Sequence, residues 1–534
     1  MLSICIFILL AAQCVYSQTK AARGKLIPAQ TKQSEAVKLI QDKQFDQAES
    51  LLRQTLEKSP SDLNARTLLG VVFDQTNRSA EAESEFLDVL RDNPKFVAAL
   101  ANLGALLSRT NRQAEAIKIL EQVLLLQPNH PSAVFNLAAI YSERREFKKA
   151  LPLLEKSVGL TPANKTPNTN DLSLLLTLAK TYAAENKVKE LGKISDYIEK
   201  LNSEDARVWF TLGLTLAQAN QYERASRIFE QVNKMRPDTF EVLYNLGVAY
   251  YNINKLNEAK TALQQAVNLD AAKPELFYRL GLIAADQNET ENAVGLWFKA
   301  IELNPNFAEP NFLIGEELRK RKNLKSALPF YEKAVAVAPE NVLYQIRVGV
   351  TYFRLQRYEN AQTVFDNELK KYPNDFRFNF LKGYLARAQG LYDVAIAAFE
   401  KAAKISPSNP DIFASLGFIA FQRGENLIAE KNLRKAIQLD PKNFPAHYDL
   451  GRVLVRQNRF AEALPILERG ATLNKTDPSI RYQLFQIYSR LKQKDKADAA
   501  FAEFKRLEKE VNGREPANDD QRGLPSALEN TKPD

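Results

Sequence analysis

Hydrophobic positions recur along most of the chain with the spacing of helices packed in pairs. Across residues 206–213, apolar side chains recur at helical spacing and form one stripe. Residues 218–221 follow as a polar turn, and a second stripe runs through Ala225, Phe229 and Val232. The pattern predicts two helices joined by a short turn.

Glycine recurs at one position of this pattern every 34 residues, and this spacing is interrupted once, between Gly104 and Gly213. We call these residues the lattice glycines. The lattice glycines are Gly70, Gly104, Gly213, Gly247, Gly281, Gly315, Gly349, Gly383, Gly417 and Gly451. An alanine follows each of them twelve residues later, from Ala82 to Ala463. Glycine within a helix costs about 1 kcal/mol relative to alanine, so its recurrence indicates close approach of the partner helix. A fixed period of this length predicts an array of repeats.

Most repeats close on a proline, which stops the second helix because proline cannot donate the next backbone hydrogen bond. These prolines are Pro60, Pro94, Pro128, Pro162, Pro237, Pro305, Pro339, Pro373, Pro407 and Pro441.

The repeat resembles that of the tetratricopeptide repeat family, whose 34-residue unit has fixed apolar, small and proline positions. The residues that match it in one repeat are Trp209, Leu212, Gly213, Ala225, Phe229 and Pro237. The resemblance implies an all-α fold, a right-handed α-solenoid of about fourteen 34-residue helix-turn-helix repeats. We place repeats 1–4 in residues 29–164 and repeats 5–14 in residues 172–511.

Several repeats depart from the pattern. Ala138 and Ala179 replace the glycine, and Leu191 stands where the alanine belongs. Residues 165–171 form an inserted loop that shifts the register, so a break in the stacking is expected there. Phe485 at the glycine position of the last repeat predicts a terminal cap.

The two ends of the chain differ from the array. An apolar run across residues 2–12 is too short to span a bilayer and predicts a signal peptide at 1–17, with a linker at 18–28. No basic residue precedes the run, which leaves a hydrophobic stub as the alternative. We expect a protein exported to the periplasm or secreted, from a bacterium, with no transmembrane span after cleavage. Residues 512–534 predict a disordered tail.

Candidate catalytic chemistry is sparse in this sequence. Both cysteines, Cys5 and Cys14, lie near the N-terminus, and His130 and His447 are too far apart in sequence for a shared metal site to be expected. Phosphate-loop, dinucleotide and nucleophile-elbow motifs are missing. We therefore expect no enzyme, no cofactor and no metal. A net charge of +9 spread over 534 residues is mild, so nucleic acid is not expected as a partner.

Binding residues are expected on the concave surface, which the first helix of each repeat lines in the resembled family. The fifth residue of many repeats is aromatic, and cations follow in the later repeats. The candidate ligand-groove residues are Tyr278, Phe312, Arg319, Lys320, Arg354, Arg377, Phe380, Arg387, Tyr448, Arg452, Arg456, Tyr482 and Arg490. Arginine beside an aromatic ring can bind a carboxylate by donating two hydrogen bonds to it, which favours an elongated anionic ligand. The alternative is that the aromatics pack between helices and the arginines are merely solvated.

Asn102, Asn136 and Asn245 occupy the sixth position of their repeats. They resemble the asparagine ladder with which long arrays of this family, including the arm of the O-linked N-acetylglucosamine transferase, hold peptide backbone. Other repeats place leucine, arginine or small residues there, so the ladder is interrupted.

Three functions fit these features. We favour an exported scaffold that binds protein segments in its concave groove and assembles an envelope complex. The alternative is a periplasmic helper of polysaccharide export or cell-wall glycan assembly, with an acidic polysaccharide as ligand. The third is an enzyme's targeting arm, for which the catalytic partner would have to be encoded separately.

Overall fold

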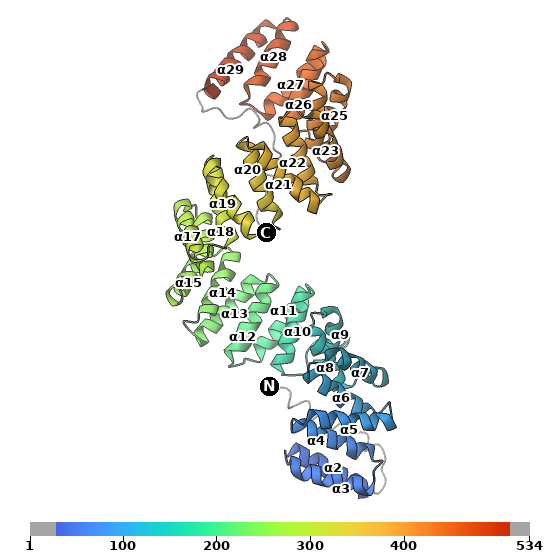
Figure 1. Cartoon of the computed structure of the whole chain (residues 1–534). Helices are drawn as coiled ribbons and strands as arrows, with labels where there is room; N and C mark the ends of the chain where they lie inside the picture. Colours follow the sequence, from blue (N-terminus) through green and yellow to red (C-terminus); the bar gives the residue numbers. More distant parts are fainter. Residues whose placement is uncertain (1–27, 513–534) are drawn as a thin grey trace. The chain divides into compact units, whose positions relative to one another are not determined.

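The computed structural model describes residues 28–512, and these residues fold entirely into α-helices and connecting turns (Figure 1). The predicted all-α fold of helical repeats is confirmed. The predicted signal peptide, nearly all of the linker and the predicted tail after Asn512 lie outside the described residues. The helices fall into two compact halves, α2–α15 and α16–α29.

Even-numbered helices are the first helices of the repeats and odd-numbered helices are the second. The first half contains α2 (Pro28–Gln41), α3 (Phe45–Lys58), α4 (Leu63–Gln75), α5 (Ser79–Asp92), α6 (Val97–Arg109), α7 (Gln113–Leu126), α8 (Pro131–Glu143), α9 (Phe147–Ser157), α10 (Leu172–Ala184), α11 (Val188–Lys200), α12 (Ala206–Gln218), α13 (Tyr222–Met235), α14 (Phe240–Asn252) and α15 (Leu256–Leu269).

The second half continues the alternation. It contains α16 (Pro274–Asp286), α17 (Thr290–Leu303), α18 (Ala308–Lys320), α19 (Leu324–Val337), α20 (Val342–Arg354), α21 (Tyr358–Lys371), α22 (Phe376–Ala388), α23 (Tyr392–Ile405), α24 (Pro410–Gln422), α25 (Asn426–Leu439), α26 (Phe444–Arg456), α27 (Phe460–Leu473), α28 (Pro478–Arg490) and α29 (Lys494–Asn512).

Asp or Asn caps fix the starts of many first helices. In each case the side-chain oxygen accepts a hydrogen bond from a backbone N–H of the first turn, which would otherwise lack a partner. These caps are Asp62, Asp171, Asp205, Asn341, Asp375, Asn409, Asn443 and Asp477.

The turn inside each repeat contains one residue in the left-handed conformation. Its φ is 57° at Asn220, inside the turn predicted at 218–221, and 60° at Lys322. The other positions are Lys43, Asn77, Asn111, Arg145, Asn186, Asn254, Asn288, Gln356, Asn458 and Lys492, with Gly390 and Gly424 in two repeats. Asn and Gly adopt this conformation at little cost, which explains their frequency here.

Each lattice glycine faces a large side chain sixteen residues later, on the second helix of its own repeat. A Cβ at Gly315 would lie 2.7 Å from Tyr331, and one at Gly383 would lie 2.9 Å from Phe399. Leu, Phe or Trp takes the same place opposite the other lattice glycines. The glycine therefore admits a bulky side chain, whereas close approach of the two backbones had been the expected reason.

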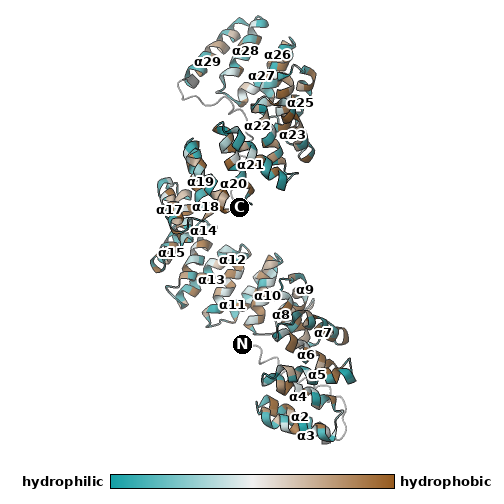
Figure 2. Ribbon diagram, in the orientation of Figure 1, coloured by the Kyte–Doolittle hydropathy of each residue, from teal (hydrophilic) through white to brown (hydrophobic). Residues whose placement is uncertain are grey.

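Each helix carries both hydrophobic and hydrophilic residues (Figure 2), and the buried hydrophobic residues form the core. The lattice alanines of the second helices, such as Ala82, Ala225 and Ala327, are fully buried. In the hairpin with Ala179, the residue sixteen positions later is the small, buried Ser195, and Leu191 is buried at the alanine position. The last hairpin places Phe485 against Phe501, with ring centroids 4.8 Å apart.

The insertion at 165–171 lies in an ordered loop between α9 and α10. Gly159 has a φ of 79°, and the Asn168 backbone N–H donates to the Val158 carbonyl oxygen at 2.9 Å. One buried cluster includes Leu154 of α9 and Leu175 of α10. The hydrophobic core thus continues across the insertion.

Within residues 28–512, tyrosines of at least five first helices donate a hydrogen bond to a glutamate on the second helix of the preceding repeat. We call these five pairs the tyrosine clamps: Tyr141–Glu121 (2.7 Å), Tyr182–Glu155 (2.9 Å), Tyr250–Glu230 (2.8 Å), Tyr352–Glu332 (2.6 Å) and Tyr488–Glu468 (2.7 Å). Burial, and then the hydrogen bond to the carboxylate, raise the pKa of Tyr141, Tyr352 and Tyr488 to about 12. The clamps fasten one repeat to the next.

Candidate functional site

The candidate aromatics of the first helices pack mainly into the interior. Phe312 and Phe380 are each 1% exposed. The Phe312 ring stacks on Tyr344 at 4.6 Å, and the Phe380 ring meets Phe399 at 5.4 Å. Their burial gives these two rings a packing role, because a ligand cannot reach them without displacing neighbouring side chains.

The other candidate aromatics are distributed differently. Tyr448 is 8% exposed, and Tyr278 is half-buried with its ring 5.2 Å from Phe307. Tyr482 is 38% exposed and contacts Phe504 at 5.3 Å. Of these rings, Tyr482 offers the largest accessible surface.

Several candidate cations have carboxylate partners close by in sequence. Arg319 pairs with Glu316 at 2.9 Å, Lys320 with Glu317 at 2.5 Å and Arg377 with Asp375 at 2.6 Å. Pairing of this kind neutralises the cation locally and reduces its attraction for an outside anion. Arg354 is half-buried and Arg490 is exposed.

The structure gathers three candidate arginines of α22 and α26 around two phenylalanines of α24, the first helix between them. The guanidinium carbon of Arg387 in α22 lies 4.9 Å from the ring centroid of Phe418 in α24. The guanidinium groups of Arg452 and Arg456 in α26 lie 4.4 Å and 3.6 Å from the centroid of Phe421. We call these five residues the arginine–aromatic strip. The strip brings Arg387, Arg452 and Arg456 close together, whereas the sequence showed only that they recur at similar positions of their repeats.

Further contacts hold the arginine–aromatic strip in place. Arg387 also lies over the Tyr384 ring at 4.3 Å, and Arg456 Nη1 donates to the Phe421 carbonyl oxygen at 2.7 Å. Arg452 Nη1 donates to Asp449 Oδ1 at 3.0 Å. Among residues 28–512, neither Arg387 nor Arg456 forms an ion pair.

Sequence reasoning missed the two phenylalanines. Phe418 and Phe421 lie three residues apart, at the ninth and twelfth positions of their repeat, and so face the same side of α24. The search for aromatics followed only the fifth position. A scan of every first-helix position for aromatic and cationic residues in neighbouring repeats would have found the pair.

A buried ionic cluster was also missed. Glu316 in α18 accepts hydrogen bonds from the Tyr331 hydroxyl at 2.6 Å and from Arg347 Nε at 2.9 Å. Burial favours the neutral acid, but the hydrogen bond from Arg319 and the charge of Arg347 outweigh it and lower the pKa of Glu316. Arg347 is 3% exposed, so this cluster is structural.

The three ladder asparagines share one contact. Each Nδ2 donates to the backbone carbonyl oxygen four residues earlier: Asn102 to Ala98 at 2.9 Å, Asn136 to Ser132 at 2.8 Å and Asn245 to Glu241 at 2.7 Å. All three are half-buried. Binding of peptide backbone by these amides stays a prediction.

The two histidines have local packing roles. His130 is 5% exposed and its Nδ1 accepts from the Ala133 N–H at 3.4 Å, which caps α8. Burial lowers the pKa of His130. His447 is 4% exposed and its Nδ1 lies 2.9 Å from the Asn443 carbonyl oxygen. Across residues 28–512, no three His, Cys, Asp or Glu side chains group as metal ligands would.

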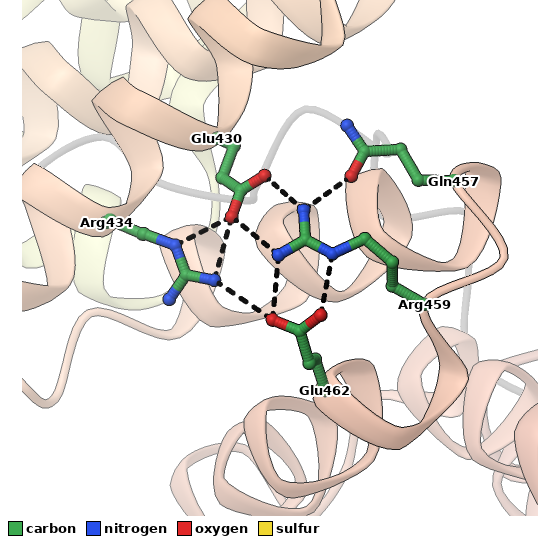
Figure 3. Close-up of polar contacts among 5 residues, drawn as sticks. All are labelled: Glu430, Arg434, Gln457, Arg459 and Glu462. Atoms are coloured by element: carbon green, nitrogen blue, oxygen red, sulfur yellow. Dashed lines mark hydrogen bonds and ion pairs between the residues drawn. The ribbon is translucent and has the colours of Figure 1, made fainter.

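Arginine–glutamate networks link second helices of neighbouring repeats. In Figure 3, Arg459 donates to Glu462 at 2.7 Å and to Glu430 at 2.6 Å, while Arg434 donates to Glu430 at 2.8 Å. Both arginines therefore have their positive charges paired with glutamate carboxylates. Networks with the same spacing, to a glutamate three residues ahead and another 29 residues back, occur at Arg78 and Arg112.

Models of the tetratricopeptide repeat match the chain at residues 39–107, 97–131, 201–280, 308–341, 348–410 and 429–478. Together the matched segments cover more than half of the chain. The chain belongs to the tetratricopeptide repeat family. Its paired helices and lattice glycines are thus those of a tetratricopeptide repeat array, a fold typical of protein-binding scaffolds.

A search of solved structures found matches at low sequence identity and low TM-score. The C-terminal part of a tetratricopeptide repeat protein from Cytophaga hutchinsonii is 18% identical, covering 45% of this chain and 99% of its own, with a TM-score of 0.40. A chain of the APC/C hetero-tetramer Cut9–Hcn1 is 12% identical over 89% of this chain and 99% of its own, with a TM-score of 0.36. Yeast Tom70 is 16% identical over 91% of this chain and 99% of its own, with a TM-score of 0.32. No curated protein gave a significant sequence match.

The helices between residues 28 and 512 include none with the length and apolar character needed to cross a bilayer.

Proposed function

We propose that this tetratricopeptide repeat protein is an exported scaffold that binds protein segments on its first-helix surface and assembles an envelope complex. The observation that carries the proposal is the arginine–aromatic strip. It places cationic side chains from successive repeats on one surface of an array whose family is typical of protein binding. In this proposal the chain itself catalyses no reaction.

Two features support the parts of the proposal beyond binding. The apolar run at residues 2–12 has the length of a signal-peptide core, which supports export. The array extends through paired helices from Pro28 to Asn512, so it presents first helices from many repeats. A scaffold of this kind can hold more than one partner segment.

Two measurements test the proposal. The full chain, expressed in its native cell, should be found in the envelope or secreted fraction, and deletion of residues 1–17 should retain it in the cytoplasm. Affinity capture of the exported protein should recover defined envelope proteins, and one of them should rebind the purified chain. Cytoplasmic location of the full chain would contradict export, and capture of glycan without protein would favour the polysaccharide helper.

A further inference from the structure

We infer that the arginine–aromatic strip is a binding site for an acidic, extended peptide segment. The inference rests on the proposed function and specifies the chemistry of the partner. It starts from the charges of Arg387 and Arg456, which lie on α22 and α26 with α24 between them.

The first step concerns which atoms of the arginines are available. A guanidinium group held over a ring by cation–π attraction still carries N–H donors for other acceptors. Arg387 lies over Tyr384 and Phe418, and Arg456 over Phe421. Arg456 uses one of the five N–H donors of its guanidinium group in the hydrogen bond to the Phe421 carbonyl oxygen. The remaining N–H edges suit the two oxygens of a carboxylate.

The second step concerns charge. Of the three arginines, Arg452 is paired with Asp449, whereas Arg387 and Arg456 pair with no carboxylate among the described residues. The cations of the second-helix networks differ, because Arg459 and Arg434 are each bonded to glutamate. Arg387 and Arg456 therefore leave two positive charges at the strip without a carboxylate among the described residues, and a ligand of opposite sign would complete it.

The third step separates a peptide from a polysaccharide. Sugar rings stack on the open face of an aromatic side chain, but Phe421 is only 4% exposed and Tyr384 only 2%. Arginine already covers both rings. Phe418 is half-buried, and Arg387 lies over it at 4.9 Å, so the accessible groups are mainly guanidinium N–H groups, which bind carboxylates. This chemistry favours an Asp- or Glu-rich peptide.

The fourth step concerns the length of the ligand. Packed helices lie about 8–10 Å apart, so the axes of α22 and α26 are about 20 Å apart. Arg387 and Arg456 both lean toward α24, where Phe418 and Phe421 lie three residues apart, so that spacing is the upper limit for their guanidinium groups. An extended chain rises about 3.3 Å per residue and needs at most about six residues to cover that span. The carboxylates that meet Arg387 and Arg456 therefore belong to different parts of one extended segment.

The experiment measures binding of a labelled oligoglutamate of about ten residues to the full chain by fluorescence anisotropy. The test variant is Arg387→Gln/Arg456→Gln. Its matched control, Arg434→Gln/Arg506→Gln, removes the same charge from arginines that already have glutamate partners. We expect the test variant to bind at least about tenfold more weakly than wild type, and the control to stay within about twofold. Arg387→Lys/Arg456→Lys should fall between them, because lysine keeps the charge but loses the planar donors.

Other outcomes overturn the inference. Equal weakening in the test and control variants would show that net charge alone drives binding. Equal binding of oligoglutamine, or tight binding of a polygalacturonate fragment without binding of oligoglutamate, would reject an acidic peptide. Helical circular dichroism confirms that the variants are folded. Envelope capture separates the two proposals: if it succeeds while both variants behave alike, the scaffold stands and the strip assignment fails.

Discussion

At the scale of single residues, two kinds of glycine occur in the same helical hairpin, formed by α16 and α17. Gly281 in α16 faces Trp297, and a Cβ there would meet the indole nitrogen. Gly295 in α17 has nothing within 4 Å of the place where a Cβ would be. The first glycine makes room for a neighbour, and the second does not.

We therefore expect Gly281→Ala and Gly295→Ala to change stability in opposite directions. Gly281→Ala should cost about 1–3 kcal/mol through overpacking, whereas Gly295→Ala should gain about 0.5–1 kcal/mol from helix propensity. Urea unfolding followed by tryptophan fluorescence measures both, since Trp297 lies in this hairpin and the chain has one other tryptophan, Trp209. A stable Gly281→Ala protein would contradict the role of the lattice glycines.

The turn residues allow a second prediction. Lys322 has a φ of 60°, a conformation that costs a side chain about 1 kcal/mol and glycine almost nothing. Lys322→Gly should raise the free energy of unfolding by roughly this amount. Gly424→Ala, at a φ of 77° with open space around it, should lower it. Thermal melts of the two variants should shift in opposite directions.

At the scale of helices, the tyrosine clamps make packing between repeats sensitive to alkaline pH. An unfolded tyrosine ionises near pH 10, whereas burial and Glu121 raise the pKa of Tyr141 in the folded state to about 12. Above pH 10 the unfolded chain loses its proton first, so the clamp's contribution is complete below pH 10 and is lost as the pH rises toward 12.

Tyr141→Phe tests this clamp. It removes one hydrogen bond, so the protein should be about 1 kcal/mol less stable at neutral pH and lose less stability between pH 10 and 12. Urea midpoints measured across this interval give both quantities. Tyr197→Phe is the control, because its hydroxyl lies on the inserted loop and donates at 3.3 Å to the Thr169 carbonyl oxygen and to Asn170. An unchanged pH profile in Tyr141→Phe would count against the clamp.

The helices were more predictable than the site because their determinants are local. The glycine, alanine and proline positions lie within one repeat, and α10 begins at Leu172, where the fifth repeat was placed. The arginine–aromatic strip depends on contacts between three repeats. Phe312 and Phe380 share the aromatic fifth position with Tyr482, yet only packing determines that the two phenylalanines are buried and Tyr482 is exposed.

At the scale of the whole molecule, the array consists of two compact halves. In a repeat protein each hairpin is stabilised by its neighbours, so a block of hairpins with its own core can fold alone. We expect residues 28–271 and 272–512, expressed separately, to give helical circular dichroism that sums to the signal of residues 28–512. Loss of helicity in either fragment would show that the halves depend on each other.

The two kinds of recurring contact have different consequences for how such a chain can lengthen. A lattice glycine and its bulky partner belong to one hairpin, so gene duplication copies both halves of the contact together. A tyrosine clamp joins two hairpins, and the new copy keeps it only if the hairpin before it carries the glutamate. Growth by duplication thus preserves the inside of every hairpin, whereas each new junction must be selected afresh.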